Sequence, residues 1–242
     1  MKKMMVLVAL VCMLAVFCLP VMATSYTVSG TDMTIELDNS AWYVFTRDNL
    51  EDNPEVAEIG ADAEAMSALL QSQNIYLDAI SKTNYMSVEL TVFKNRNEFS
   101  KEAGNLSERP RSEVDKLVQN SQNGSAERSF SVYENTYTFV EETGIDKGFY
   151  YCKFLTVVNQ EEYILQFISG QPIDQTYARQ IVDTVRFDVD TSLNPQRASF
   201  FDSVAGRTVI GGVIGACAVG VTALIAKKNK KKKAAEPAQP GE

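Results

Sequence analysis

The sequence predicts an α+β fold in which helices flank a mostly antiparallel β-sheet, followed by one transmembrane helix near the C-terminus. Between residues 24 and 190, short strand patterns alternate with a few helical patterns. The segment 147–158 is apolar on both of its faces, which is typical of a central strand covered on both sides of a sheet. A later segment, 208–226, carries no charged residue, and its length predicts a membrane span.

The N-terminal residues are typical of a secretory signal. Lys2 and Lys3 precede an apolar run, 4–19, which Pro20 and a few small residues end. A basic start, an apolar stretch and small residues at the cleavage position are what a signal peptidase requires. We therefore expect residues 1–23 to be a signal peptide, with an uncleaved signal anchor as the alternative. In both cases the segment that follows is exported.

The apolar segment near the C-terminus indicates how the chain is oriented in the membrane. At ~1.5 Å per helical residue, 208–226 approaches the roughly 30 Å of a bilayer core. Six lysines follow within 227–233, and an excess of lysine marks the cytoplasmic side. We expect a single-pass cell-membrane protein with an extracellular domain (24–190), a stalk (191–207) and a lysine-rich cytoplasmic tail (227–242).

Charge is distributed unevenly along the chain. The formal net charge is −8, but the segment from Thr24 to Ser203 holds 29 acidic and only 14 basic residues. Such an acidic segment lacks the cations that contact nucleic-acid phosphates, so no nucleic acid is expected as a partner. The lysine tail is attracted to anionic lipid, which makes the lipid bilayer the first expected partner.

Alternating apolar residues predict the strands of the outer domain, and polar turns predict its hairpins. Asp38–Ser40 predicts a hairpin turn between the first two strands, and Asn159 with Gln160 predicts another between the last two. In 86–93, Leu90 and its apolar neighbours alternate with polar residues, which predicts one buried face. The predicted strands are 33–37, 42–46, 75–80, 86–93, 130–134, 136–142, 147–158 and 163–169.

Four helices are predicted from capping residues and from apolar residues at helical spacing. Asp62 caps a helix that buries Met66, Leu69 and Leu70, and 97–101 forms a short second helix. Ser112 and Asp115 predict a capping box at the start of a third helix, which buries Val114, Leu117 and Val118. Asp174 caps a final helix that ends near Phe187.

The order of these elements resembles that of PsbP-like domains. The resemblance rests on the strand leading into Trp42-Tyr43-Val44-Phe45, the strand pair 150–158 and 163–169, and the ending 181–187. It extends to membrane-anchored extracellular proteins of Gram-positive bacteria. It implies an α/β/α sandwich over most of 24–190 and a tendency to bind partners. It implies no functional residue of this chain.

Histidine and cysteine usage excludes several kinds of chemistry. The chain has no histidine, which excludes histidine-based triads and zinc sites built on histidine. Cys152 is the one cysteine of the outer domain, so no disulfide can form within that domain. We expect a buried, inert thiol; the alternatives are intermolecular pairing and a redox sensor.

Carboxylates and aromatic residues are the remaining candidates for chemistry. Paired carboxylates can cleave a glycosidic bond, and clustered oxygens can bind calcium, but no spacing here indicates either. We expect a solvated acidic surface, and we expect Trp42 and the tyrosines to form core rather than a sugar platform. No catalytic residue, cofactor or metal ligand is therefore predicted. The pairs considered are Glu51/Asp52, Glu141/Glu142, Glu161/Glu162 and Asp188/Asp190.

The predicted membrane span carries a row of small residues. Gly212, Ala216 and Gly220 recur at every fourth position, which lets a second helix approach closely. This row predicts a homodimer or a protein partner that pairs through the membrane helix. The alternative is that the small residues have no such role, because they are common in membrane helices.

Together these patterns predict a membrane-tethered extracellular binding or assembly module and give no sign of enzymatic machinery. The alternative is a cell-surface enzyme that uses carboxylates alone, for example on glycans. A strongly raised carboxyl pKa in a cleft would favour the enzyme. A broad exposed apolar patch would favour the assembly module.

Overall fold

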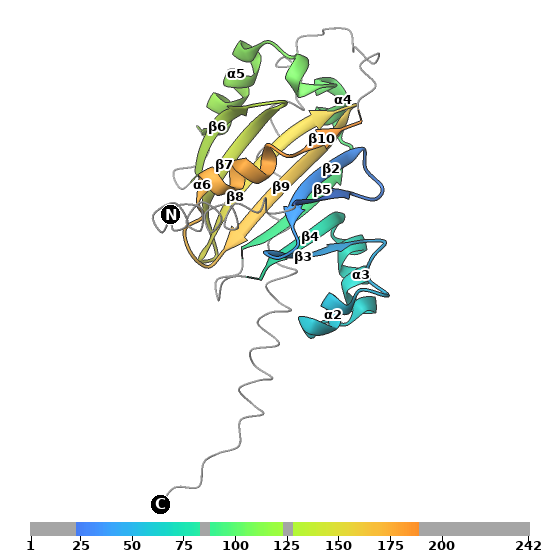
Figure 1. Cartoon of the computed structure of the whole chain (residues 1–242). Coiled ribbons are helices and arrows are strands. Elements are labelled where there is room, and N and C mark those ends of the chain that lie inside the picture. Colours follow the sequence, from blue (N-terminus) through green and yellow to red (C-terminus); the bar gives the residue numbers. More distant parts are fainter. Residues whose placement is uncertain (1–22, 83–87, 123–127, 189–242) are drawn as a thin grey trace, which may run out of the picture.

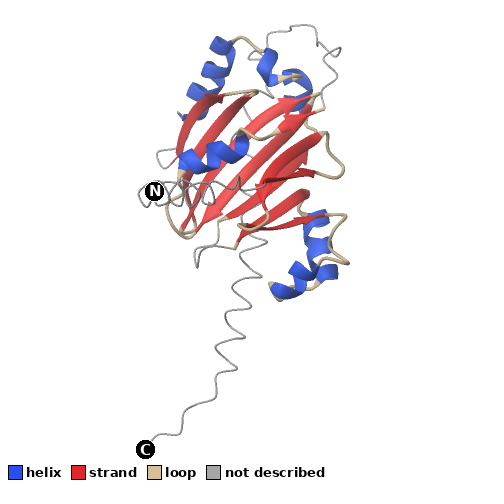
Figure 2. Ribbon diagram, viewed as in Figure 1, coloured by secondary structure: helices blue, strands red, loops and turns tan. Residues whose placement is uncertain are grey.

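A computed structural model of the chain describes residues 23–82, 88–122 and 128–188. Its centre is a seven-stranded antiparallel sheet in the order β3-β4-β5-β9-β8-β7-β6. Figures 1 and 2 show this sheet with helices packed around it. The predicted α+β class with a mostly antiparallel sheet is therefore confirmed. The strands are β3 (Trp42–Thr46), β4 (Ile75–Ser81), β5 (Glu89–Asn95), β6 (Arg128–Glu134), β7 (Thr138–Asp146), β8 (Phe149–Val158) and β9 (Glu161–Ser169).

A second, three-stranded sheet packs against one face of the large sheet. It consists of β1 (Ala23–Thr27), β2 (Met33–Asp38) and β10 (Arg186–Phe187), with β2 in the middle. Met33, Ile35 and Leu37 of β2 share one buried cluster with Trp42 of β3. We call this side of the large sheet the first face.

The predicted opening hairpin is wrong, although both of its strands exist. The turn after Asp38 forms as expected, because the Asp38 side chain accepts a hydrogen bond from Ser40 N at 2.8 Å. The chain then crosses from the small sheet to the edge of the large one, so β2 and β3 stack instead of pairing. Turn residues fix the reversal of the chain, but they do not decide whether two strands share a sheet.

The final helix also covers the first face. α6 (Gln175–Val182) begins as predicted, since Asp174 Oδ1 accepts hydrogen bonds from Thr176 N and Tyr177 N. Its buried side packs Ala178, Ile181 and Val182 into the cluster of the first face. The helix ends at Val182 rather than near Phe187, because the residues around Phe187 pair with β2 as strand β10.

The opposite side, which we call the second face, carries two separate groups of helices. α2 (Pro54–Glu58) and α3 (Ala63–Ser72) bury Val56, Met66 and Leu70 against Phe45 and Ile75 of the sheet. α4 (Glu98–Ala103), the 3₁₀ turn η1 (Leu106–Glu108) and α5 (Arg111–Gln122) form a second apolar cluster with β6, β7 and β8. In Figure 1 the two groups lie at opposite ends of the sheet.

Capping explains two of these helix starts, and the third corrects a prediction. Asp62 caps α3 through Ala65 N, as predicted, and Asn97 forms a capping box with Ser100 at α4. α5 starts at Arg111, directly after a proline, so Ser112 lies inside the helix and caps nothing. Asp115 instead forms an ion pair with Arg111 at 2.8 Å.

The long C-terminal hairpin forms as predicted. β8 pairs with β7 on one side and β9 on the other, so it is an interior strand. Asn159 and Gln160 have φ angles of 52° and 63°, and this pair of positive angles is typical of a two-residue hairpin turn.

No helix in the described ranges is both long enough and apolar enough to cross a membrane. The predicted signal (1–22 of its 23 residues), stalk, membrane span and tail lie outside those ranges. The same holds for Gly212, Ala216 and Gly220, so their proposed role in helix association stays a prediction.

Candidate functional site

A row of buried polar side chains crosses the second face of the large sheet. Strand register places Asp78 of β4 opposite Thr91 of β5, and Thr91 opposite Gln166 of β9. It then places Gln166 opposite Lys153 of β8, and Lys153 opposite Glu142 of β7. All five are buried, with at most 9% of each residue exposed. We call Asp78, Thr91, Gln166, Lys153 and Glu142 the polar row.

The alternation that predicted a single buried face in β5 is half right. Leu90 and Val92 lie in the core of the first face, as expected. Glu89 and Thr91 point to the second face, and they are only 5% and 2% exposed. Both faces of β5 are therefore covered, and the polar residues of this strand are buried rather than solvated.

Glu89 extends the polar row by one carboxyl group. Asp78 and Glu89 lie on neighbouring strands and are hydrogen-bonded to each other. Burial raises the pKa of Asp78 to about 7. The pKa of Glu89 lies well above its usual range because of burial first and the nearby Asp78 charge second. The two residues, which we call the acid pair, therefore hold a proton near neutral pH.

Three oxygen atoms around the acid pair lack a hydrogen-bond partner within the described part of the chain. They are Asp78 Oδ1, Glu89 Oε1 and Thr91 Oγ1. A buried polar group without a partner costs about 1–3 kcal/mol. The Thr91 hydroxyl group carries this cost, because its oxygen has no partner within the described residues.

The other end of the polar row is electrically compensated. Tyr151 Oη donates a hydrogen bond to Glu142 Oε1 at 2.8 Å, and Arg128 lies 3.7 Å from the same oxygen. Lys153 Nζ is 4.8 Å from the centroid of the Tyr151 ring. Burial raises the pKa of Glu142, while Lys153, Tyr151 and Arg128 oppose that rise. Glu142 thus has the charged and polar neighbours that the acid pair lacks.

The neighbouring Glu141 points to the first face, as adjacent strand residues must. It accepts a hydrogen bond from Arg179 at 2.6 Å and another from Ser131 at 3.1 Å. Cys152 Sγ lies 3.7 Å from the same carboxylate. Burial, followed by the Glu141 charge, raises the pKa of the Cys152 thiol. The expectation that Cys152 is buried is confirmed, and its protonated form is favoured.

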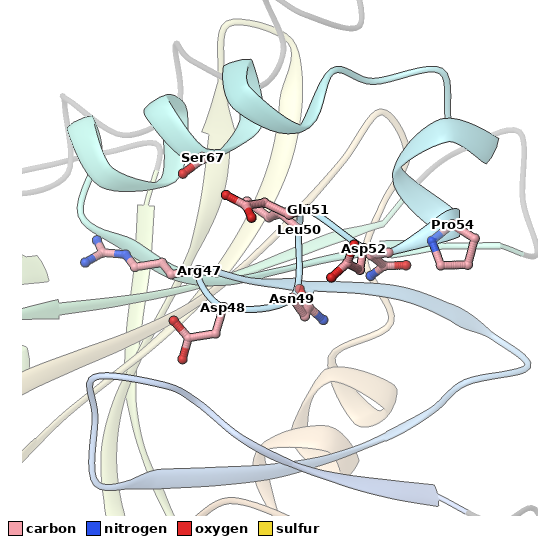
Figure 3. Close-up of a pocket in the computed structure, with 9 residues that line it drawn as sticks. Arg47, Asp48, Asn49, Leu50, Glu51, Asp52, Pro54 and Ser67 are labelled. Carbon is pink, nitrogen blue, oxygen red and sulfur yellow. The ribbon is translucent and has the colours of Figure 1, made fainter.

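The other carboxylate pairs considered from the sequence do not come together as a site. Glu51 and Asp52 are exposed, and they line an open pocket of about 600 Å³ with Arg47 and Asp48 (Figure 3). Arg47 donates hydrogen bonds to two backbone carbonyls, and Asp48 accepts one from Ser29. Within the described ranges, no three Asp, Glu or Cys side chains are grouped closely enough to hold a metal ion.

The expected solvated acidic surface is wrong for three of the acids considered. Glu141, Glu142 and Glu162 are at most 5% exposed, and burial raises the pKa of Glu162. Asp188 is exposed, and its predicted partner Asp190 lies outside the described residues. The prediction for Trp42 is confirmed, since it is 2% exposed and lies in the core.

The acid pair itself was not predicted. Asp78 and Glu89 lie on consecutive strands, where Asp78 interrupts an apolar pattern and Glu89 is on the polar side of an alternating one. The signal available in the sequence was a charged residue inside a predicted strand, because such a residue is either solvated or unusually buried. Only the strand register shows that the two residues meet.

Comparison with known proteins adds no assignment to this geometry. A scan against protein-family models gives no match for the chain, and a search of curated proteins gives none either.

Proposed function

We propose that this chain is a membrane-tethered extracellular binding module whose ligand engages the acid pair on the second face of the sheet. The observation that carries the proposal is the set of three buried, unpartnered oxygens on β4 and β5 within the described residues. Buried polar groups in proteins nearly always have partners. A ligand that supplies those partners would offset the cost of burying them.

Features at the two ends of the sequence support the tether. They are the signal-like residues 1–23, the charge-free segment 208–226 and the lysines that follow it. Small residues at 212, 216 and 220 support association of the proposed span with a second helix. An antiparallel sheet covered on both faces is compatible with the PsbP-like sandwich, and we propose that family for residues 24–190.

The raised pKa values of the acid pair favour the alternative of a carboxylate enzyme, but the geometry opposes glycan cleavage. Glycosidases hold their two carboxyl groups about 5–9.5 Å apart, on either side of the bond that breaks. Asp78 and Glu89 are hydrogen-bonded to each other, and this contact leaves no room for a sugar between them. Binding therefore accounts for the pair better than hydrolysis.

The exposed apolar residues do not indicate a broad assembly surface. Among the described residues, the large apolar side chains with high exposure are Ile145, Phe149 and Tyr177. Two of them flank the turn between β7 and β8, and the third lies on α6. We therefore place the proposed binding at the polar second face rather than at an apolar patch.

The proposal can be tested by crosslinking in intact cells, followed by purification of the full-length protein and mass spectrometry. The test variant carries Asp78→Asn and Glu89→Gln, which keep the shape of both side chains and remove their acidity. The control variant carries Asp146→Asn and Glu36→Gln, which make the same changes at exposed strand positions. We expect the wild type and the control variant to be crosslinked to the same partner. The test variant should lose that partner. Equal recovery from all three proteins, or recovery of no partner, would reject the proposal.

A further inference from the structure

The acid pair and Thr91 place three hard oxygen donors on two neighbouring strands. Thr91 is directly opposite Asp78, and Glu89 lies two residues from Thr91 on the same face of β5. Asp78, Glu89 and Thr91 are 2%, 5% and 2% exposed. The Thr91 hydroxyl is an independent sign of a ligand, because it is a neutral group that has no partner within the described residues.

The described surroundings of the acid pair supply no balancing positive charge. Strand register places Phe45 opposite Asp78, and it places Ile80 and Ile168 on the two sides of Glu89. The nearest cation of the polar row is Lys153, which lies on β8, beyond β5 and β9, and faces Glu142. Little water screens the negative charge of the acid pair in such an apolar setting, so a cation that displaces its proton would be attracted to both carboxyl groups.

We infer that Asp78, Glu89 and Thr91 form a binding site for a hard divalent cation, and that Ca²⁺ fits it better than Mg²⁺. The inference rests on the proposed binding function and names the cation that the acid pair holds when the module binds its partner. Carboxylate and hydroxyl oxygens are ligands for both ions, and the side-chain amide of Gln166, opposite Thr91, can supply a further oxygen. Ca²⁺ accepts the irregular arrangement that strand positions impose, whereas Mg²⁺ requires a nearly ideal octahedron.

The site differs from one built on three acids. It has two carboxyl groups and neutral oxygens, and within the described residues no third Asp, Glu or Cys side chain joins them. A low count of charged ligands lowers the affinity for Ca²⁺. We therefore expect binding in the weaker range that is typical of extracellular calcium modules, with dissociation constants of about 10⁻⁴–10⁻³ M.

The test is calorimetric titration of the full-length protein in detergent, after chelator treatment and dialysis, with CaCl₂ and separately with MgCl₂. Asp78→Asn and Glu89→Gln each remove a charged ligand, and Thr91→Val removes only the hydroxyl. Glu36→Gln is the matched control in an exposed strand position. Circular dichroism of every variant establishes that it is folded before titration.

We expect one Ca²⁺ per wild-type chain and weaker binding of Mg²⁺. Thr91→Val should weaken Ca²⁺ binding, and each acid variant should lose measurable binding, because the affinity depends on the number of charged ligands. The control should bind like the wild type. Absence of Ca²⁺ binding by the wild type, or unchanged binding by folded acid variants, would overturn the inference.

The outcome of the Ca²⁺ titration can be distinguished from the outcome of the crosslinking in cells. A partner that depends on the acid pair in cells, without Ca²⁺ binding by the purified protein, would overturn the cation site and leave the binding function standing. An ammonium ligand, such as a lysine side chain of that partner, would then be the occupant. Ca²⁺ binding without such a partner would support the cation site and reject the function that we propose.

Discussion

Replacing Asp78 by Asn should stabilise the outer domain at neutral pH, even though it removes a buried hydrogen-bonding acid. The pKa of Asp78 rises from an ordinary value of 3.8 to about 7 because of burial. Each unit of pKa corresponds to ~1.36 kcal/mol, so ionising this group above pH 7 costs the folded state about 4 kcal/mol. Asn has nearly the same shape and no charge, and it removes most of that cost.

The sign of the pH dependence follows from the same pKa. The folded state holds the proton more tightly than the unfolded chain does, so stability is full below about pH 4 and is lost as pH rises to about 7. Glu89, Glu142 and Glu162 have raised pKa values and act in the same direction. The wild type should therefore lose stability across this range, and Asp78→Asn should lose about 4 kcal/mol less.

The assay is urea unfolding of the full-length protein at a series of pH values, with a chelator present. Fluorescence of Trp42, the one tryptophan of the chain, reports on the core because this residue is 2% exposed. Asp146→Asn is the control at an exposed position. If wild-type stability is constant or rises between pH 4 and 7, or if Asp78→Asn is the less stable protein at pH 7.5, the assignment of a buried acid pair is wrong.

Three further predictions concern packing, capping and the thiol. Gly144→Ala should lower stability by about 1–3 kcal/mol, because the added Cβ would lie 2.6 Å from Tyr151 Oη; unchanged urea unfolding would contradict this contact. Asp174→Ala should cost about 0.5–2 kcal/mol through loss of the α6 cap, whereas Asp174→Asn should cost less, and equal melting temperatures for both would contradict the capping. Cys152 should react with a thiol reagent only after unfolding, because burial raises its pKa and hides it; rapid labelling of the native protein, followed by mass spectrometry, would contradict its placement.

Local chemistry made part of the fold predictable. The turn after β8 follows from Asn159, a residue type that tolerates positive φ, and the caps at Asp62 and Asp174 follow from side chains that accept hydrogen bonds from backbone amides of the first helical turn. The interior position of β8 follows from apolar residues on both of its faces. Each of these features depends on a short stretch of sequence.

Features that depend on distant partners were predicted poorly. β2 and β3 were expected to pair, but β2 finds its neighbours in β1 and the C-terminal β10. The end of α6 was placed too late for the same reason, since the residues that follow it pair with β2. Alternation along a strand shows which residues share a face, but it does not show which other strand lies beside it.

The candidate site was missed because the sequence does not show how the two strands that carry it are aligned. An acid at Glu89 in an alternating pattern fits a solvated face, and the pattern alone does not show that the second face is also covered. The meeting of Glu89 with Asp78 depends on the register of β4 and β5, which shifts between Ile75 and Leu77. No short sequence motif encodes that shift.

The most direct test of the central claim, that the acid pair is a binding site, is the yield of crosslinked partner from intact cells. The yield from the Asp78→Asn/Glu89→Gln protein is divided by the yield from the Asp146→Asn/Glu36→Gln control, with both proteins expressed at the same level. We expect the yield to fall about tenfold or more, because loss of a hydrogen-bonded charge costs on the order of 1.5–3 kcal/mol. Equal yields from the two proteins would contradict a binding role for the acid pair.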